Sequence, residues 1–175
     1  MDSAAWIRAA PLLLAAVSGL VMALFAEPLT IPDSMEMIAE GGCMLGLEPS
    51  SGICAQLNPA YWTPGWSLPV GMLSFMIHPL AAAGAVSVLA MSLLVLPCWS
   101  LGWRLGDRWA AATAALLVVA TPALQTYGML ADGRGMALLC LFGAWALALR
   151  SLDEERSRTW AALGGAVAGV GVLVR

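Results

Sequence analysis

The sequence predicts an all-α integral membrane protein: a polytopic bundle of about five transmembrane helices, with one outside loop that carries short interfacial helices. Two observations predict this fold class. The 175 residues are 61% hydrophobic and only 11% charged, whereas soluble domains contain about 25% charged residues. Long apolar runs also alternate with short charged segments, as in a chain that crosses a bilayer several times.

The composition excludes several classes of protein. A soluble domain of this length needs more charge to cover its surface. The net charge of −3 argues against nucleic acid as a partner, because phosphate binding needs a basic face. The 4 cysteines form no CxxC or Cys/His cluster in the sequence, which disfavours a structural zinc site.

Five apolar runs are the expected spans. The first covers residues 9–27, and we interpret it as an uncleaved signal anchor rather than a signal peptide, because it is long for a signal peptide. The last contains Gly165-x-x-x-Gly169, a small-residue face that needs a partner helix. We therefore expect residues 1–175 to be one membrane domain, the truncated N-terminal part of a longer protein. The other spans are expected at residues 79–103, 109–127, 131–149 and 160–175.

The arginines predict the orientation. If the spans alternate, only Arg134 and Arg175 fall on one side of the membrane, and all other arginines fall on the opposite side. The positive-inside rule then places the N-terminus in the cytoplasm and the acidic loop 28–78 outside. We expect the protein in the inner membrane of a bacterium. The arginines of the cytoplasmic side are Arg8, Arg104, Arg108, Arg150, Arg156 and Arg158.

The outside loop contains one predicted surface helix, which begins near Asp33 and runs to about Gly46. Asp33 suits the N-cap position and Glu36 the capping-box position three residues later. An apolar stripe at helical spacing is expected opposite Glu36 and Glu40, which would lie on a solvated face. The stripe comprises Met35, Ile38, Ala39, Gly42 and Leu45.

The second half of the outside loop holds turn signals and two cysteines. Pro64-Gly65 predicts a turn. Val70–Ile77 predicts a short half-buried helix, which His78-Pro79 ends before the second span. Cys43 and Cys54 would face an oxidising compartment, where they either form a disulfide or stay free thiols.

Several short motifs occur here in the order found in one enzyme family. Asp33-Ser34 opens the loop, Trp62-Thr63-Pro64-Gly65-Trp66-Ser67-Leu68-Pro69 closes it, and Ala120-Thr121-Pro122 precedes Asp132. With Gly164–Arg175, they resemble the N-terminal part of C-type multi-spanning glycosyltransferases, the group of protein O-mannosyltransferases and lipid A aminoarabinose transferases. The resemblance covers nearly the whole chain. Met37 stands where the family usually has Tyr or His.

The resemblance implies an inverting transferase that moves a hexosyl or pentosyl group from a polyprenyl-phosphate sugar lipid. The acceptor would be a lipid, a protein or a glycan on the outer face, and the isolated fragment would be inactive. Asp33 would be the catalytic base, with helix capping as its alternative role. Asp132, Arg134 and Arg175 would contact substrate or phosphate. Their alternatives are a local Asp/Arg pair in a Gly-rich turn and a snorkelling helix end.

Two further expectations and two rival functions complete the prediction. Trp62, Pro64 and Gly65 form the family's loop motif, and a divalent metal ion near the acidic motif would be assisted by Glu36. A transporter or channel fragment would instead have charges inside spans, broken helices and repeat symmetry. A non-enzymatic membrane scaffold would use the Gly165-x-x-x-Gly169 face. Membrane lipids are partners under each reading.

Overall fold

The computed structural model describes residues 3–25, 32–46, 54, 64–153 and 157–174 and is all-α within them, as predicted. Of residues 3–8, 25, 32–34 and 153 it describes the backbone alone. The helices in chain order are α1 (Ser3–Phe25), α2 (Pro32–Met44), α4 (Pro64–Ser74), α5 (Pro79–Leu93), α6 (Val95–Leu105), α7 (Arg108–Ala120), α8 (Pro122–Met129), α9 (Arg134–Asp153) and α10 (Ser157–Leu173).

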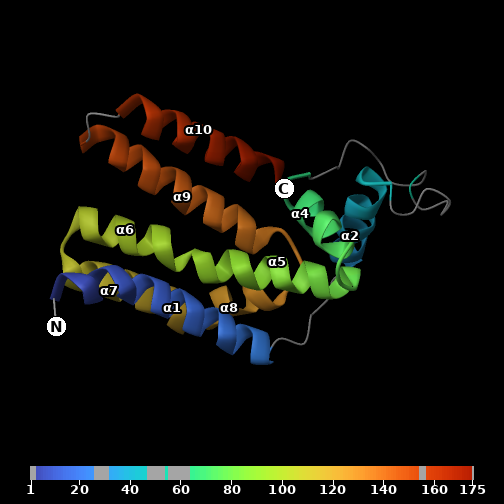
Figure 1. Ribbon diagram of the computed structural model, residues 1–175, viewed down its shortest axis with the longest axis horizontal. Helices are drawn as coiled ribbons and strands as arrows, with labels where there is room; N and C mark the ends of the chain where they lie inside the picture. Colours follow the sequence, from blue (N-terminus) through green and yellow to red (C-terminus); the bar gives the residue numbers. More distant parts are fainter. Residues whose placement is uncertain (1–2, 26–31, 47–53, 55–63, 154–156, 175) are drawn as a thin grey trace.

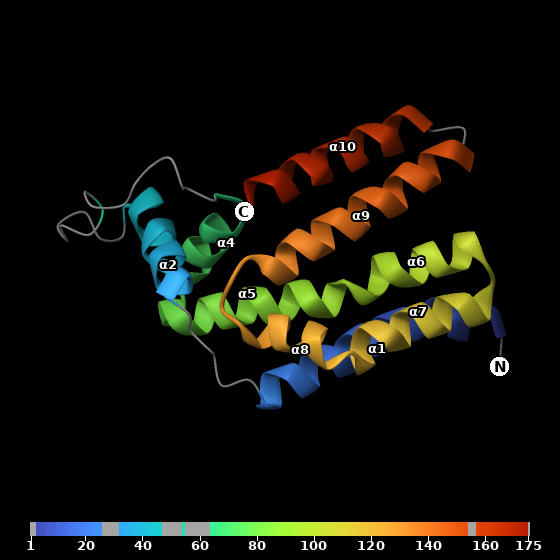
Figure 2. The same cartoon turned by 180° about the vertical axis from the view of Figure 1, so that it is seen from behind.

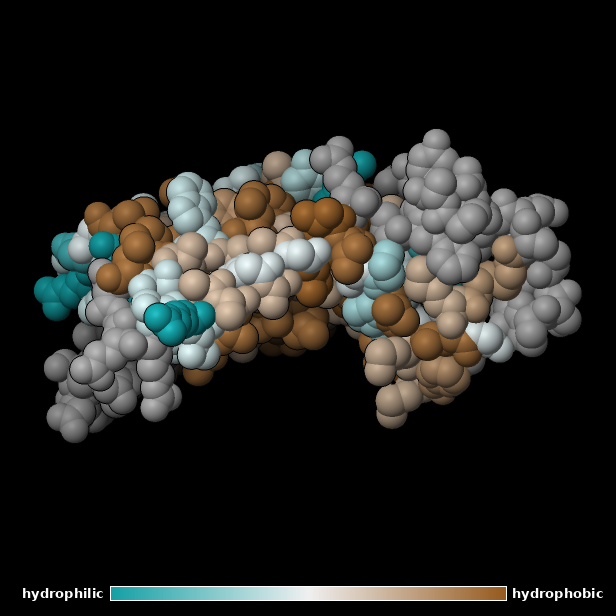
Figure 3. Space-filling view, turned by 90° about the horizontal axis from the view of Figure 1, so that it is seen from above, coloured by the Kyte–Doolittle hydropathy of each residue, from teal (hydrophilic) through white to brown (hydrophobic). Residues whose placement is uncertain are grey.

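The long helices lie side by side, and the two short helices α2 and α4 lie together at one end (Figures 1 and 2). We call the end formed by α2, α4 and the α8–α9 turn the loop end. The hairpin end, opposite, holds the start of α1, the α6–α7 turn, the end of α9 and the start of α10 (Figure 1). Hydrophilic residues gather at one end of the described surface, and its long side is tan to brown in Figure 3.

The number of membrane spans differs from the five expected. Two helices in the described part of the chain are long and apolar enough to cross a bilayer, Pro79–Leu105 with 27 residues and Arg134–Leu152 with 19. The bent pair α7 and α8 makes a third if it counts as one span. The apolar part of α1 described here, Ala9–Leu24, is shorter than 18 residues, and α10 has 17 residues. α10 is shorter than the roughly 20 residues that cross a hydrocarbon core at 1.5 Å per residue, whereas the whole of α1 has 23 residues.

Prolines break two of the expected spans. α5 and α6 meet at Leu94, three residues before Pro97, which has no N–H to donate to the carbonyl four residues earlier. α7 and α8 meet at Thr121-Pro122 with a bend of 57°. The second span is therefore kinked, and the third is not the continuous helix expected over residues 109–127.

The core of the bundle is apolar and closely packed. Met22 on α1 and Met91 on α5 are buried with Leu94, Val95 and Val118. A methyl group added to Gly128 on α8 would overlap the Met22 sulfur and press on Met91, so a larger residue there would displace these side chains. Small residues thus let α1, α5 and α8 approach one another, as in membrane helix packing.

At the loop end, α2 and α4 pack with their backbones almost in contact. A Cβ atom added to Gly71 would lie 2.6 Å from the Gly41 carbonyl oxygen, and one added to Gly41 would overlap the Ser67 carbonyl oxygen. Ser67 donates a hydrogen bond of 2.8 Å to Glu40 Oε2, and both side chains are buried. The expected solvated position of Glu40 is therefore wrong, because Ser67 satisfies its carboxylate inside the contact.

Other details of the two surface helices also differ from the expectations. Met35 of the expected apolar stripe is 56% exposed within the described part of the chain, and Glu36 is exposed as expected. α2 begins at Pro32, so Asp33 lies in the first turn rather than at the N-cap. Pro64 is the first residue of α4 rather than part of a turn, because proline is well suited to the first helical position.

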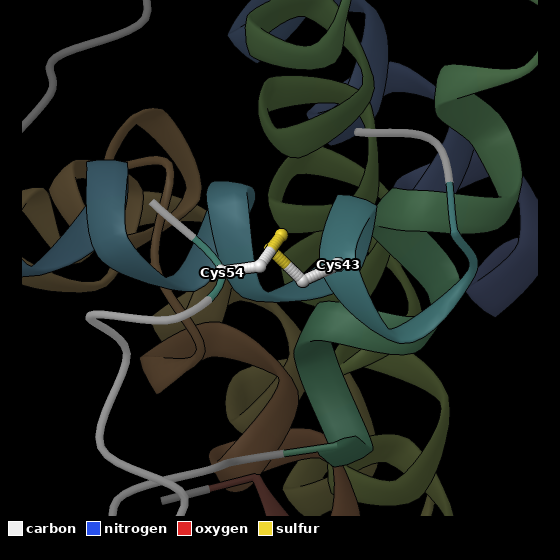
Figure 4. Close-up of a disulfide and its surroundings, with 2 residues drawn as sticks. All are labelled: Cys43 and Cys54. Carbon is white, nitrogen blue, oxygen red and sulfur yellow. A yellow bond between two sulfur atoms is a disulfide. The ribbon is translucent and has the colours of Figure 1, made fainter. Parts of the chain in front are cut away.

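Cys43 and Cys54 form a disulfide, with a Cα–Cα distance of 5.6 Å (Figure 4). Of the two alternatives, free thiols are thus excluded. The bond joins the end of α2 to a residue 11 positions later in the chain. It constrains the loop end, where α2 and α4 provide a small packing surface.

Candidate functional site at the loop end

The α8–α9 turn brings Asp132 and Arg134 together. Asp132 Oδ1 accepts a hydrogen bond of 3.0 Å from the Arg134 backbone N–H, and Asp132 Oδ2 lies 3.2 Å from Arg134 Nε. The Asp132 side chain is 4% exposed and that of Arg134 is 58% exposed. The carboxylate is therefore enclosed while the guanidinium stays accessible. This is the local Asp/Arg pair that the alternative reading predicts, and it leaves the cation available to a ligand.

Burial raises the pKa of the Asp132 carboxyl above its ordinary value, because the charged form loses its hydration. The hydrogen bond from the Arg134 N–H and the positive charge of Arg134 act against burial, because both lower the pKa of the Asp132 carboxyl. Oδ2 accepts no hydrogen bond from any described residue. Both carboxylate oxygens thus face Arg134, Oδ1 through its backbone N–H and Oδ2 through the ion pair with Nε, and together they hold Arg134 in place.

The turn itself is anchored to α5 and to the end of α10. Ser87 on α5 donates a hydrogen bond of 3.1 Å to the Asp132 carbonyl oxygen. A Cβ atom on Gly133 would lie 2.9 Å from the Val174 carbonyl oxygen, and one on Gly135 would lie 2.9 Å from Met91 Cγ. The backbone therefore passes so close to α5 and to the end of α10 that only glycine fits at these positions.

The predicted loop motif contributes to the same corner. A Cβ atom on Gly65 would lie 2.8 Å from a Val174 methyl group, so the start of α4 packs on the end of α10. Trp66, the next residue, is fully buried with Ala131 and Val174. Its indole N–H has no hydrogen-bond acceptor among the described residues. Pro64 lies at the first position of α4, and Trp62 lies outside the described residues.

The remaining predicted residues are placed only in part. Asp33 lies in the first turn of α2, but its side chain lies outside the described residues. Arg175 lies outside them entirely, although its neighbour Val174 contacts Gly133. No group of three His, Cys, Asp or Glu residues that could hold a metal ion occurs in the described ranges. The roles of Asp33, Arg175 and Glu36 stay predictions.

An apolar groove of about 800 Å³ adjoins this corner. It runs between α1 and α5 and reaches Gly128 and Met129 at the end of α8. Arg134 is not among the groove residues, but its guanidinium lies 5.9 Å from the centre of the ring of Tyr127, the residue before Gly128. Ser92 is the one polar side chain among the groove residues, and it donates its hydrogen to the Val88 carbonyl oxygen. The groove thus has an apolar interior and a cation near one end.

The sequence did not predict that Trp66 and Ser67 are buried, and it did not predict the groove. The burial of Glu40 has no local signal either, because its partner Ser67 lies 27 residues later in the chain. The groove has no local signal in the sequence, since its small residues come from α1 and α5, which are separated by more than fifty residues.

Comparison with known proteins adds no relative. The chain matches no protein-family model, no curated protein and no solved structure. The resemblance to C-type glycosyltransferases therefore rests on the short motifs alone, and it stays a prediction.

Proposed function

We propose that the chain is the N-terminal membrane part of a C-type glycosyltransferase that uses a polyprenyl-phosphate sugar donor. One observation carries the proposal. The accessible Arg134 guanidinium lies beside the ring of Tyr127, and Tyr127 directly precedes Gly128 and Met129 of the apolar groove in the chain. A polyprenyl phosphate has a long apolar chain and an anionic head, so the groove and Arg134 would each complement one part of it.

The proposed reaction needs a base and a charge-stabilising cation. The acceptor hydroxyl oxygen attacks the anomeric carbon and forms the new glycosidic bond, while the bond to the phosphate oxygen breaks and its electron pair leaves with the phosphate. The hydroxyl proton passes to a carboxylate, for which Asp33 is the candidate. Arg134, held by Asp132, would stabilise the charge growing on the phosphate, and Arg175 would assist it. A divalent ion near Glu36 is a further expectation of the same resemblance.

The proposed topology adds further helices to the spans that were identified by length and composition. α1 and α10 lie alongside the longer helices (Figure 1), and we assign both to the membrane, with α7 and α8 as one bent span. The hairpin end, which carries Arg104, Arg108, Arg150 and Arg158, would face the cytoplasm of a bacterial cell. The loop end, with the candidate site, would face outward.

Ligand binding tests the proposal directly. The purified chain in detergent is mixed with a polyprenyl phosphate or with the matching polyprenol, and bound ligand is counted by native mass spectrometry. We expect the phosphate to bind several-fold more tightly than the alcohol. Arg134→Gln should remove that preference, and equal binding of both ligands by the unmodified chain would contradict the assignment of Arg134.

A matched pair of substitutions tests the groove. Ala16→Phe places a ring in the groove, whereas Ala166→Phe places the same ring on an exposed face of α10 outside it. We expect the first to weaken binding of phosphate and alcohol alike and the second to leave both unchanged. In the longer protein, Asp33→Asn should abolish release of polyprenyl phosphate from the sugar donor while donor binding persists.

Specific observations favour two other candidates. Nothing lies within 4 Å of Cβ atoms added to Gly165 and Gly169 on α10, which favours the membrane scaffold. The break at Thr121-Pro122 is a feature of transporters. A scaffold would tolerate Asp33→Asn and Asp132→Asn but lose function with Gly165→Leu. A transporter would move labelled substrate across vesicles without glycosyl transfer.

A further inference from the structure

α4 and the turn after it carry an apolar ridge on the outside of the loop end. The ridge consists of Leu68, Met72, Phe75 and Met76, which are 37%, 64%, 62% and 83% exposed. These positions follow the helical spacing i, i+4, i+7 and i+8, which puts them on one face. The turn keeps this face together, since the Met76 and Ile77 backbone N–H groups both bond to the Leu73 carbonyl oxygen.

The other face of α4 is already fully used by the chain. Trp66, Ser67, Val70 and Gly71 are buried, and Gly71 lies against the Gly41 backbone. Because α4 cannot turn over without breaking this contact, the ridge must face away from the described part of the chain. Its side chains are as exposed as those on the long sides of the bundle, where Leu89 is 59% exposed.

The chemistry of the ridge fits lipid better than protein. Residues 64–77 contain no charged side chain, whereas protein interfaces have a polar rim with hydrogen bonds around their apolar centre. The ridge continues through Ile77, which is 42% exposed, to Pro79, where the candidate span Pro79–Leu105 begins. An uncharged apolar face joined directly to a span is typical of a segment that lies in the bilayer interface.

We propose that α4 and residues 75–77 form an in-plane membrane anchor, with the ridge inserted in the lipid leaflet on the loop-end side. The anchor fixes the position of the candidate site relative to the membrane surface, because Trp66 on the opposite face of α4 packs beside Ala131 in the α8–α9 turn. This inference goes beyond the proposed function and does not depend on it, since a scaffold or transporter could use the same anchor.

Site-directed fluorescence tests the anchor. Met72→Cys and Met76→Cys are labelled with an environment-sensitive fluorophore, with Met35→Cys as the matched control. Met35 is also an exposed methionine, 56% exposed, but lies on α2 beside the exposed Glu36. Cys98→Ala and Cys140→Ala remove the free cysteines. Each labelled full chain is reconstituted in phosphatidylcholine vesicles and quenched with iodide in water or with nitroxide-labelled phospholipid.

We expect labels on the ridge to be quenched by the nitroxide lipid, and their iodide quenching to be several-fold weaker than at Met35. Iodide quenching equal to that at Met35 would overturn the proposal. Protection from both quenchers would overturn it as well, because a protein surface, a second copy or another segment of this chain would then cover the ridge. Mass spectrometry of the Cys43–Cys54 disulfide confirms that each labelled variant has folded.

Discussion

The two ends of the molecule handle polar groups in opposite ways. At the hairpin end, Asp107 and Arg108 are exposed, and the Asp107 carboxylate accepts hydrogen bonds from Trp109 N and Ala110 N. At the loop end, Glu40 and Asp132 are buried, at 4% and 3% exposure. Enclosing a carboxylate costs free energy unless hydrogen bonds or opposite charge replace its hydration. The loop end therefore depends on specific partners, and the hairpin end on helix capping.

The same difference bears on which end of the molecule is the functional one. A chain that needed only stability could keep its carboxylates at the surface, as the hairpin end does. Enclosed carboxylates with nearby cations are typical of sites that bind or transfer charge. The contrast supports the loop end as the functional end, and the following substitutions are chosen to break or sharpen it.

Gly41→Ala should have the largest effect. Its Cβ would overlap the Ser67 carbonyl oxygen, so α4 must move away from α2, with a loss of about 3 kcal/mol of unfolding free energy. Gly42→Ala is the matched control one residue later, where nothing lies within 4 Å. It should stabilise the helix by up to about 1 kcal/mol. Thermal unfolding in detergent measures both, and equal melting temperatures would contradict the close α2–α4 contact.

The contact between α2 and α4 also marks the limit of what the sequence predicts. The helical fold could be predicted because apolar runs and helix signals are local. The burial of Glu40 could not, since its partner Ser67 lies 27 residues away in the chain. Pro64-Gly65 predicts a turn because both residues favour turns, yet proline is equally suited to the first position of a helix. Local chemistry there allows two outcomes, and tertiary packing selects one.

The same limit applies to the spans and to the candidate site. The sequence shows where apolar runs lie, but Pro97 and Pro122 interrupt two of them, and the resulting bends depend on neighbouring helices. The Asp132–Arg134 pair could be predicted, because only Gly133 separates its members in a Gly-rich turn. Its anchoring by Ser87 could not, since nothing local indicates that α5 reaches the turn.

Ser67→Ala should have the second largest effect. It removes the donor of the buried hydrogen bond to Glu40 Oε2 and should cost about 2 kcal/mol, because a buried carboxylate oxygen then loses a partner. Ser74→Ala, on the same helix, removes a bond to the Val70 carbonyl within α4 and should have a much smaller effect. Denaturant unfolding followed by tryptophan fluorescence compares the two variants. Equal losses of unfolding free energy would show that the buried Ser67–Glu40 hydrogen bond contributes no more to stability than a bond within α4.

Asp107→Ala tests the hairpin end and should cost about 1 kcal/mol, the usual value of an N-cap side chain. The carboxylate accepts bonds of 2.8 Å from Trp109 N and 3.0 Å from Ala110 N. Asp107→Asn keeps an acceptor at the cap and should be nearly neutral. Hydrogen exchange of the first turn of α7 reports the cap locally. A large loss with Asp107→Asn would mean that charge, rather than capping, matters at this end.

The smallest effect concerns the contribution of Asp132 to the pH dependence of stability. Burial raises the pKa of Asp132 above its ordinary value of 3.8, so the folded chain holds this proton more tightly than the unfolded chain. Stability contributed by the protonated group is therefore present below the ordinary value and decreases as the pH rises through the raised pKa. The decrease is limited because the Arg134 N–H and charge act in the opposite direction.

Asp132→Asn should flatten this part of the stability curve, because asparagine does not titrate. Melting temperatures of the unmodified chain and the variant should diverge as the pH rises from the ordinary aspartate range, with the variant losing less. Parallel curves for Asp132→Asn would show that enclosure of Asp132 has no energetic cost, and the contrast between the two ends would then rest on Glu40 alone.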